Sequence, residues 1–259
     1  MQLAMSRVLG ENPETRNKIK KVILTDRDFE ILEFIMDMKF AGVEEVFEKY
    51  FKVTLSNEQA RSSLWAKKRL MQLEKAKFLN SVRPFSEPAR CFTATFKAYY
   101  ALTQYSPEKF VNKPSGGFDQ RTFVHDREVL KARLFLESNE KIKSWASERK
   151  LRSSSEFTGV LASQYIPDSI YITSSEVKVA FELEIALKAK SRYQDKIRKY
   201  VQHMRSANLK NKFFDRVQFV CSKESVARFL IKETRIYGEL FQIILLTDFY
   251  TKRKEVEVG

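Results

Sequence analysis

The chain has 259 residues, enough for one large or two ordinary domains, and 43% of them are hydrophobic and 31% charged, a composition that excludes an extended disordered or fibrous protein. Its 47 Lys and Arg against 33 Asp and Glu give a formal net charge of +14, which favours a polyanionic partner, above all nucleic acid. No apolar run approaches the roughly 20 residues that cross a bilayer, and the N-terminus is too short and polar for a signal peptide. We therefore expect a cytoplasmic protein with no membrane partner.

Turn-forming residues concentrate in "SPEKFVNKPSGGFDQ", residues 106–120, which is the predicted boundary between two domains. Both sides are basic, with a net charge of +6 over residues 1–113 and +8 over residues 114–259. The expected organisation is an N-terminal extension (1–24), a first domain (25–112), a linker (113–119) and a second domain (120–259).

The sequence of the first domain predicts three helices followed by two strands. Thr25 is placed to cap a helix with apolar residues at helical spacing, and a short helix follows over residues 43–51. Ser56 is placed to cap a third helix whose open face is basic. The segment after it is interrupted by Pro84 and Pro88, which suits two short strands joined by a loop. This order predicts a winged helix-turn-helix.

In a winged helix-turn-helix the third helix lies in the major groove of DNA and the wing contacts the backbone. The cations that would make these contacts are Arg61, Lys67 and Lys68 on the helix, with Arg83 or Arg90 on the wing. The alternative is that these side chains only solvate the outer face of the domain, since winged helices also serve as protein-interaction modules.

The second domain is expected to begin with a long amphipathic helix over residues 120–150. Strands near 159–163, 169–172 and 177–185, a basic helix over 186–205, a strand at 216–221, a helix at 224–236 and a strand at 240–250 follow. A crossover helix between the third and fourth strands predicts a mixed sheet with helices on its faces. The fold class is therefore α+β or α/β.

Two carboxylates stand inside an apolar strand of this domain. Because strand side chains alternate, Glu182 and Glu184 project from the same face, roughly 7 Å apart, and Asp168 begins the neighbouring strand where it could converge with them. Three such carboxylates repel one another unless they are protonated, paired with cations or bound to a metal. An all-oxygen site would favour Mg²⁺ or Mn²⁺.

The "PD" at Pro167 and Asp168 and the "ELE" at residues 182–184, within this order of helices and strands, resemble the PD-(D/E)xK nuclease fold, also called restriction-endonuclease-like, with its α-β-β-β-α-β core. Together with the N-terminal winged helix and "HD" at His125 and Asp126, the chain resembles the replication-relaxation family of bacterial plasmid and mobile-element proteins. The resemblance covers about residues 25–248.

The resemblance implies that Asp168 and Glu182 are the metal ligands, and it places Glu184 where the pattern has a Lys. Lys188 is the candidate substitute, which could orient a water or stabilise phosphate charge, and His125 and Asp126 are auxiliary candidates. The cofactor of an active site would be Mg²⁺ or Mn²⁺. The alternative is a structural network in which the carboxylates pair with Lys188, Arg192 or cations of the first helix of the domain.

Residues 187–216 hold ten Lys and Arg against two Asp, and Lys188, Arg192, Lys196 and Lys199 are predicted to follow DNA phosphates. The leading hypothesis is a duplex-DNA-binding protein with a regulatory or plasmid-maintenance role, whose nuclease-like domain is degenerate. The alternative is a Mg²⁺-dependent DNA endonuclease or nickase targeted by the winged helix. A homodimer is compatible with either hypothesis.

Overall fold

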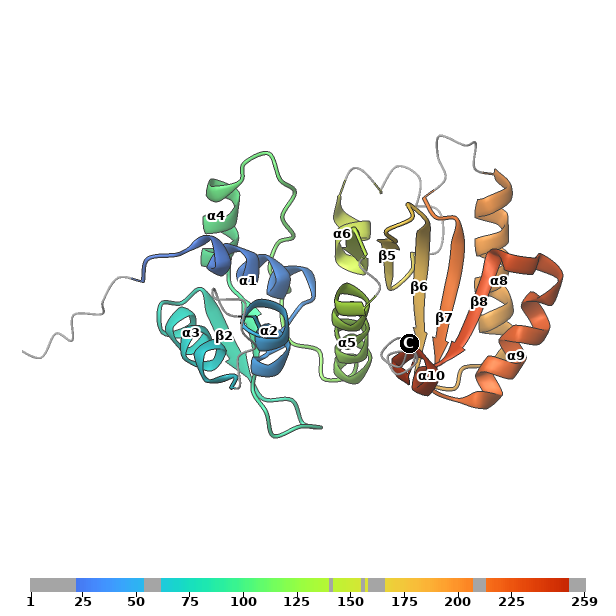
Figure 1. The fold of residues 1–259 in the computed structure, drawn as a ribbon, viewed down its shortest axis with the longest axis horizontal. Coiled ribbons are helices and arrows are strands. Elements are labelled where there is room, and N and C mark those ends of the chain that lie inside the picture. The colour runs from blue at the N-terminus through green and yellow to red at the C-terminus, as the bar shows by residue number, and fades with distance from the viewer. Residues whose placement is uncertain are drawn as a thin grey trace, which may run out of the picture.

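The computed structural model describes residues 22–53, 62–139, 142–154, 157, 166–206 and 213–251. It is a mixed α/β structure with a small antiparallel sheet and a mixed five-stranded sheet (Figure 1). The elements of the N-terminal half are α1 (Asp26–Asp37), β1 (Ala41–Gly42), α2 (Val43–Tyr50), α3 (Leu64–Lys75), β2 (Leu79–Val82), β3 (Cys91–Ala94) and α4 (Phe96–Tyr105). Those of the C-terminal half are α5 (Phe123–Asn139), β4 (Ser144–Ser147), α6 (Glu148–Ser153), β5 (Ser169–Ile172), β6 (Lys178–Glu184), α8 (Lys190–Ser206), β7 (Arg216–Cys221), α9 (Glu224–Thr234), the 3₁₀ helix η3 (Arg235–Leu240), β8 (Phe241–Leu245) and α10 (Leu246–Thr251).

Helix α1 begins where the sequence predicts it. The backbone N–H and the hydroxyl of Thr25 both donate to the Asp28 carboxylate, at 2.7 and 2.8 Å, which satisfies polar groups at the helix start. Arg69 of α3 also binds Asp28, with Nη2 2.5 Å from Oδ2, so this cation joins α3 to α1 and does not face outward. The two strands expected after α3 form a three-stranded antiparallel sheet with β1, in the order β1-β3-β2.

The larger sheet has the order β4-β5-β6-β7-β8. Strands β4, β5 and β6 pair antiparallel, and β6, β7 and β8 pair parallel. Helix α8 provides the crossover between β6 and β7, because parallel neighbours need a long connection. The prediction of a mixed sheet is therefore confirmed. Helices α8 and α9 lie on one side of the sheet, and α5 lies on the other, between the sheet and the N-terminal half (Figure 1).

The helix predicted over residues 120–150 and the strand predicted over 240–250 are both shorter in the structure. Helix α5 ends at Asn139, and β4 forms the edge of the sheet at Ser144–Ser147, because Trp145 is buried there against the rings of Tyr171 and Phe181, at centroid distances of 6.1 and 5.7 Å. Strand β8 stops at Leu245, where α10 begins. The strand predicted at 159–163 and the cap predicted at Ser56 lie outside the described residues.

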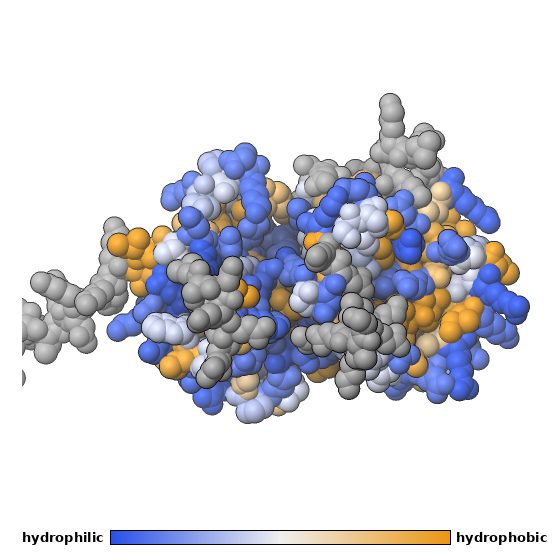
Figure 2. Space-filling view, viewed as in Figure 1, coloured by the Kyte–Doolittle hydropathy of each residue, from blue (hydrophilic) through white to orange (hydrophobic). Residues whose placement is uncertain are grey.

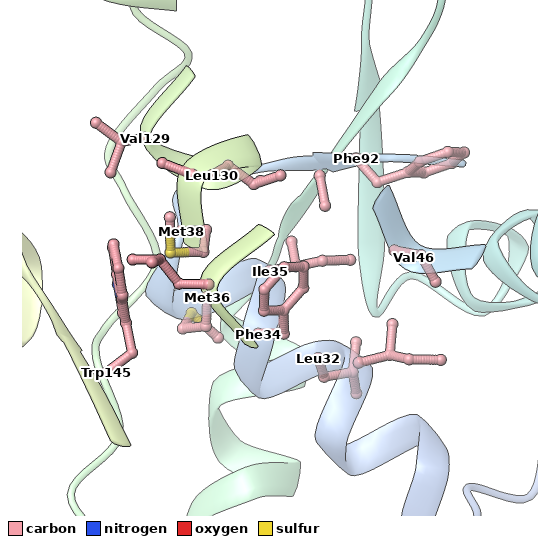
Figure 3. Packing of buried hydrophobic residues seen from close by; sticks show 14 of the residues in the cluster. Leu32, Phe34, Ile35, Met36, Met38, Val46, Phe92, Val129, Leu130 and Trp145 are labelled. Carbon is pink, nitrogen blue, oxygen red and sulfur yellow. The ribbon is translucent and has the colours of Figure 1, made fainter. Parts of the chain in front are cut away.

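One hydrophobic core runs through both halves of the chain. It includes Leu32 and Met36 of α1, Leu130 of α5, Trp145 of β4 and Phe181 of β6, and Figure 3 shows side chains from α1, α5 and β4 meeting there. The domain boundaries remain a prediction. A second cluster fills the space between the sheet and α8 and α9. On the face seen in Figure 2, hydrophilic residues cover much of the described surface. In the described part of the chain, no helix is both long and apolar enough to cross a membrane.

Candidate functional site

The alternation predicted for β6 sorts its side chains between the two cores. Phe181 and Leu183 belong to the core beneath α5, and Ala180 belongs to the core beneath α8. Glu182 and Glu184 share the face of Ala180, and their exposed fractions are only 1% and 0%. The sheet therefore presents two buried carboxylates to α8, where a charge without a partner would be strongly destabilising.

The partner that α8 supplies is Lys196. Its ammonium lies 2.7 Å from Oε2 of Glu182 and also binds Oε1 of Glu184. The side chain is 6% exposed, so the expectation that Lys196 follows phosphates at the surface is wrong. One helical turn further on, the hydroxyl of Tyr200 donates to Oε1 of Glu182. Side chains four residues apart lie on the same helix face, which explains why Lys196 and Tyr200 reach the same carboxylate.

Lys188 binds the second carboxylate oxygen of Glu184. It lies in the turn before α8, and its Nζ is 2.7 Å from Oε2 of Glu184. Glu184 thus carries two ammonium partners, one buried and one partly exposed. The predicted pairing of the carboxylates with Lys188 is present in the structure, whereas Lys196 was the partner that sequence reasoning missed.

Asp168 lies beside these carboxylates, as the strand pattern predicts, because its neighbour Ser169 pairs with Phe181 across β5 and β6. Its Oδ2 accepts a hydrogen bond of 2.8 Å from the backbone N–H of Leu183. Nε2 of His125, in the first turn of α5, lies 3.3 Å from the same oxygen. Asp168 is therefore held between the sheet and α5.

His125 continues the network toward the N-terminal half. Its Nδ1 is 3.5 Å from Oδ1 of Asp126, and the Asp126 carboxylate accepts two bonds of 2.9 Å from Nζ of Lys39, just after α1. Burial lowers the pKa of His125, but its contacts with Asp126 and Asp168 outweigh burial and raise the pKa to about 10. Burial raises the pKa of both Asp side chains, and the cations around them outweigh it, so both pKa values lie below the usual range.

Four acids and four bases make up this charge network, which we define by its residues: Glu182, Glu184, Asp168 and Asp126 with Lys196, Lys188, His125 and Lys39. With all eight groups ionised their formal charges cancel. Burial raises the pKa of Glu182 to about 7; Lys196 opposes that shift and Asp168 adds to it. Burial therefore opposes ionisation of Glu182 even though the ammonium of Lys196 lies beside it.

The residues that the nuclease resemblance assigns to a metal, Asp168 and Glu182, are engaged with partners from the protein itself in this structure. The ammonium of Lys196 forms an ion pair with Glu182 at 2.7 Å. Oδ2 of Asp168 accepts from the backbone N–H of Leu183 and contacts His125. Among the described residues, no group of three or more His, Cys, Asp and Glu side chains is arranged to hold a metal ion. The arrangement can balance charge between the sheet, α8 and α5.

The charge network predicts a falling stability as pH rises above neutrality. His125 has a pKa of about 10 when folded and about 6.5 when unfolded, so its contribution is complete below about pH 6.5 and is lost as pH approaches 10. Because the side chain is partly exposed, we expect a loss of roughly 2–4 kcal/mol. Urea unfolding at about pH 6.5 and about pH 9.5 measures it. His125→Gln should flatten this dependence, and an unchanged slope in that variant would show that His125 does not cause it.

The cations predicted to contact DNA in the N-terminal half are exposed where the structure describes them. Lys67, Lys68, Arg83 and Arg90 all lie at the surface, and Arg61 lies outside the described residues. Lys67 of α3 and Arg90, just before β3, line one hollow of about 560 Å³. Its other lining residues include Met71, Phe92 and the acids Glu44 and Glu45.

The open face of α3 also carries apolar side chains that the sequence analysis did not single out. Trp65 is 68% exposed and Met71 51% exposed. The ammonium of Lys68 lies 5.0 Å from the centre of the Trp65 ring, close enough for a cation–π contact. This surface therefore combines positive charge with stacking area, both of which nucleic acids accept.

The second predicted basic surface is smaller than expected. Arg192 and Lys199 of α8 are exposed, but Lys199 lies 3.2 Å from Asp195, Lys188 binds Glu184 and Lys196 is buried. Arg198 and Arg205 also lie on the outside of α8.

No family model, curated protein or solved structure matches the chain at a significant level. What the structure establishes is a mixed α/β protein with a mixed five-stranded sheet and a buried, charge-balanced cluster beneath α8.

Proposed function

We propose that this protein binds duplex DNA through an N-terminal winged helix and serves a regulatory or plasmid-maintenance role, with a degenerate nuclease-like domain in its C-terminal half. The observation that carries the proposal is that Lys67 of α3 and Arg90 beside β3 line the same hollow. In a winged helix these are the positions from which helix and wing contact neighbouring parts of the duplex. The net charge of +14 supplies the long-range attraction.

The order of elements in the N-terminal half supports this class of domain. Helices α1, α2 and α3 precede the β2–β3 pair, β1 adds the third strand, and the β2–β3 connection projects from the lower edge of the structure (Figure 1). The exposed face of α3 is the surface that would enter the major groove.

The degenerate character of the C-terminal half rests on Lys196. The fold class implied by the resemblance uses an acidic pair to hold a metal, whereas here the two glutamates of β6 share an ammonium inside the protein. The carboxylates then stabilise the contact between the sheet and α8, and the domain contributes surface area and charge to DNA binding.

A salt series tests the binding. We expect the protein to retard a random-sequence duplex in a gel at low salt, with log affinity falling linearly as log salt rises and a slope of roughly −0.9 for each phosphate contact. Mg²⁺ should act only as added salt. A duplex that is not retarded at low salt would exclude the proposed function.

A second candidate is Mg²⁺-dependent DNA cleavage. The observation that favours it is that an Asp, a Glu and a Lys converge at one place, since Asp168 lies beside Glu182 and Lys196 lies 2.7 Å from Glu182. Asp168 and Glu182 would then hold the metal, and cleavage would be lost in Glu182→Gln.

A further inference from the structure

Phe85, at the tip of the β2–β3 connection, is 92% exposed, more than any other large hydrophobic side chain in the described part of the chain. The residue before it, Pro84, is buried, and the residue after β2, Arg83, is exposed. An isolated exposed phenylalanine is not by itself informative. Phe85 differs from such a residue because side chains of the C-terminal half hold the backbone around it.

Two side chains from the C-terminal half hold the tip. The side-chain amide of Gln120 accepts from the backbone N–H of Phe85 at 3.0 Å and donates to the carbonyl of Arg83 at 3.4 Å. Arg127 of α5 forms an ion pair with Glu87, further along the same connection. The loop is therefore anchored on both sides of Phe85, and the ring is presented to solvent from a fixed backbone.

The charges around the ring select the partner. Arg83 and Arg90 flank the connection and are exposed, whereas its acid, Glu87, forms an ion pair with Arg127, which also binds Glu45. Arg90 also lines the hollow that it shares with Lys67, so the tip adjoins the surface of α3 assigned to DNA. A fixed apolar ring on a positive loop matches the wedges that some proteins insert between base steps of the minor groove.

Resting on the proposed function, we propose that Phe85 inserts between base pairs of bound duplex DNA and bends it, with Arg83 beside it in the minor groove. The anchoring by Gln120 and Arg127 lowers the entropy lost on insertion, because the loop is ordered before binding. Flexible pyrimidine–purine steps would be the preferred positions, since they unstack most easily.

Energy transfer between fluorophores at the two ends of a short duplex with a central TA step tests the proposal. The wild-type protein should bind and raise the transfer efficiency by shortening the end-to-end distance. Phe85→Ala should bind the duplex about ten-fold more weakly, the effect of one lost stacking contact. The salt dependence of its affinity should be unchanged, and the rise in transfer efficiency should be absent. Phe85→Leu, which keeps an apolar wedge, should restore most of the rise.

Phe96→Ala is the matched control, because Phe96 is also an exposed phenylalanine, 57% accessible, but begins α4 instead of the loop. It should leave affinity and energy transfer unchanged. Equal bending by Phe85→Ala and the wild-type protein would overturn the wedge while leaving DNA binding intact. Sedimentation of the DNA-free protein tests a different role. If the wild-type protein self-associates and Phe85→Ala does not, the ring contacts a second copy of the chain and the wedge is overturned. A wild-type protein that fails to bind any duplex would overturn both the wedge and the proposed function.

Discussion

Replacing Lys196 with Met should lower the free energy of unfolding by about 3–5 kcal/mol, the usual effect of removing one partner from a buried ion pair. The substitution keeps a long apolar stem but removes the ammonium that binds both Glu182 and Glu184, and among the described residues Glu184 then keeps its ion pair with Lys188. Both glutamates are almost completely buried, so water cannot replace the ammonium. Urea denaturation at neutral pH gives the measurement.

Lys199→Met is the control, since Lys199 lies on the same helix but its side chain is 47% exposed and forms an ion pair with the surface residue Asp195. It should change stability by less than about 0.5 kcal/mol. Adding Glu182→Gln and Glu184→Gln to Lys196→Met should recover part of the loss, because the unpaired charges are removed. A Lys196→Met protein as stable as the control would contradict the charge network.

The second large effect concerns DNA. Reversing Lys67, Lys68 and Arg90 to Glu should weaken duplex binding by about 3 kcal/mol or more at low salt, at roughly 1 kcal/mol for each lost contact, and should reduce the salt slope. Fluorescence anisotropy with a labelled duplex measures both quantities.

A matched variant separates the site from net charge. Lys131, Lys143 and Arg228 are exposed cations of the C-terminal half, and their reversal to Glu changes the net charge by the same amount. This variant should lose only the weaker, long-range part of the attraction. If both triple variants lose affinity equally, α3 and the wing are not the DNA surface.

The direction in which the β6 carboxylates point could be predicted because it depends on one local rule. Side chains of a strand alternate between faces, so the apolar residues around Glu182 and Glu184 predict which way both carboxylates point. The same rule, applied to the neighbouring strand, brings Asp168 close to them. These relations depend on backbone geometry and need no knowledge of distant contacts.

Lys196 could not be assigned by charge pattern alone, because a cation on a basic helix is expected to face water. A signal was nevertheless present in the spacing. Lys196 lies three residues after Tyr193 and four before Tyr200, and both rings are buried, so this Lys belongs to the inner face of α8. A buried ammonium needs acidic partners, which Glu182 and Glu184 provide. The sequence periodicity of β6 and that of α8 each predict an inner face, but neither predicts that these two faces pack against each other.

The edge strand β4 was missed for a different reason. Residues Ser144–Ser147 follow a helix closely, and their short sequence continues an amphipathic pattern. What makes them a strand is pairing with β5 and the burial of Trp145 against Tyr171, which are tertiary contacts that override local preference. The position of His125 beside Asp168 likewise depends on how α5 packs on the sheet.

The most direct test of the central claim, that Lys196 and the glutamates form a structural pair and not a catalytic centre, is nicking of a supercoiled plasmid by the wild-type protein with Mg²⁺ or Mn²⁺. We expect the plasmid to be bound but to stay supercoiled, with no more nicking than in the presence of the Glu182→Gln variant. Metal-dependent nicking by the wild-type protein that disappears in Glu182→Gln, while that variant still binds the plasmid, would contradict it.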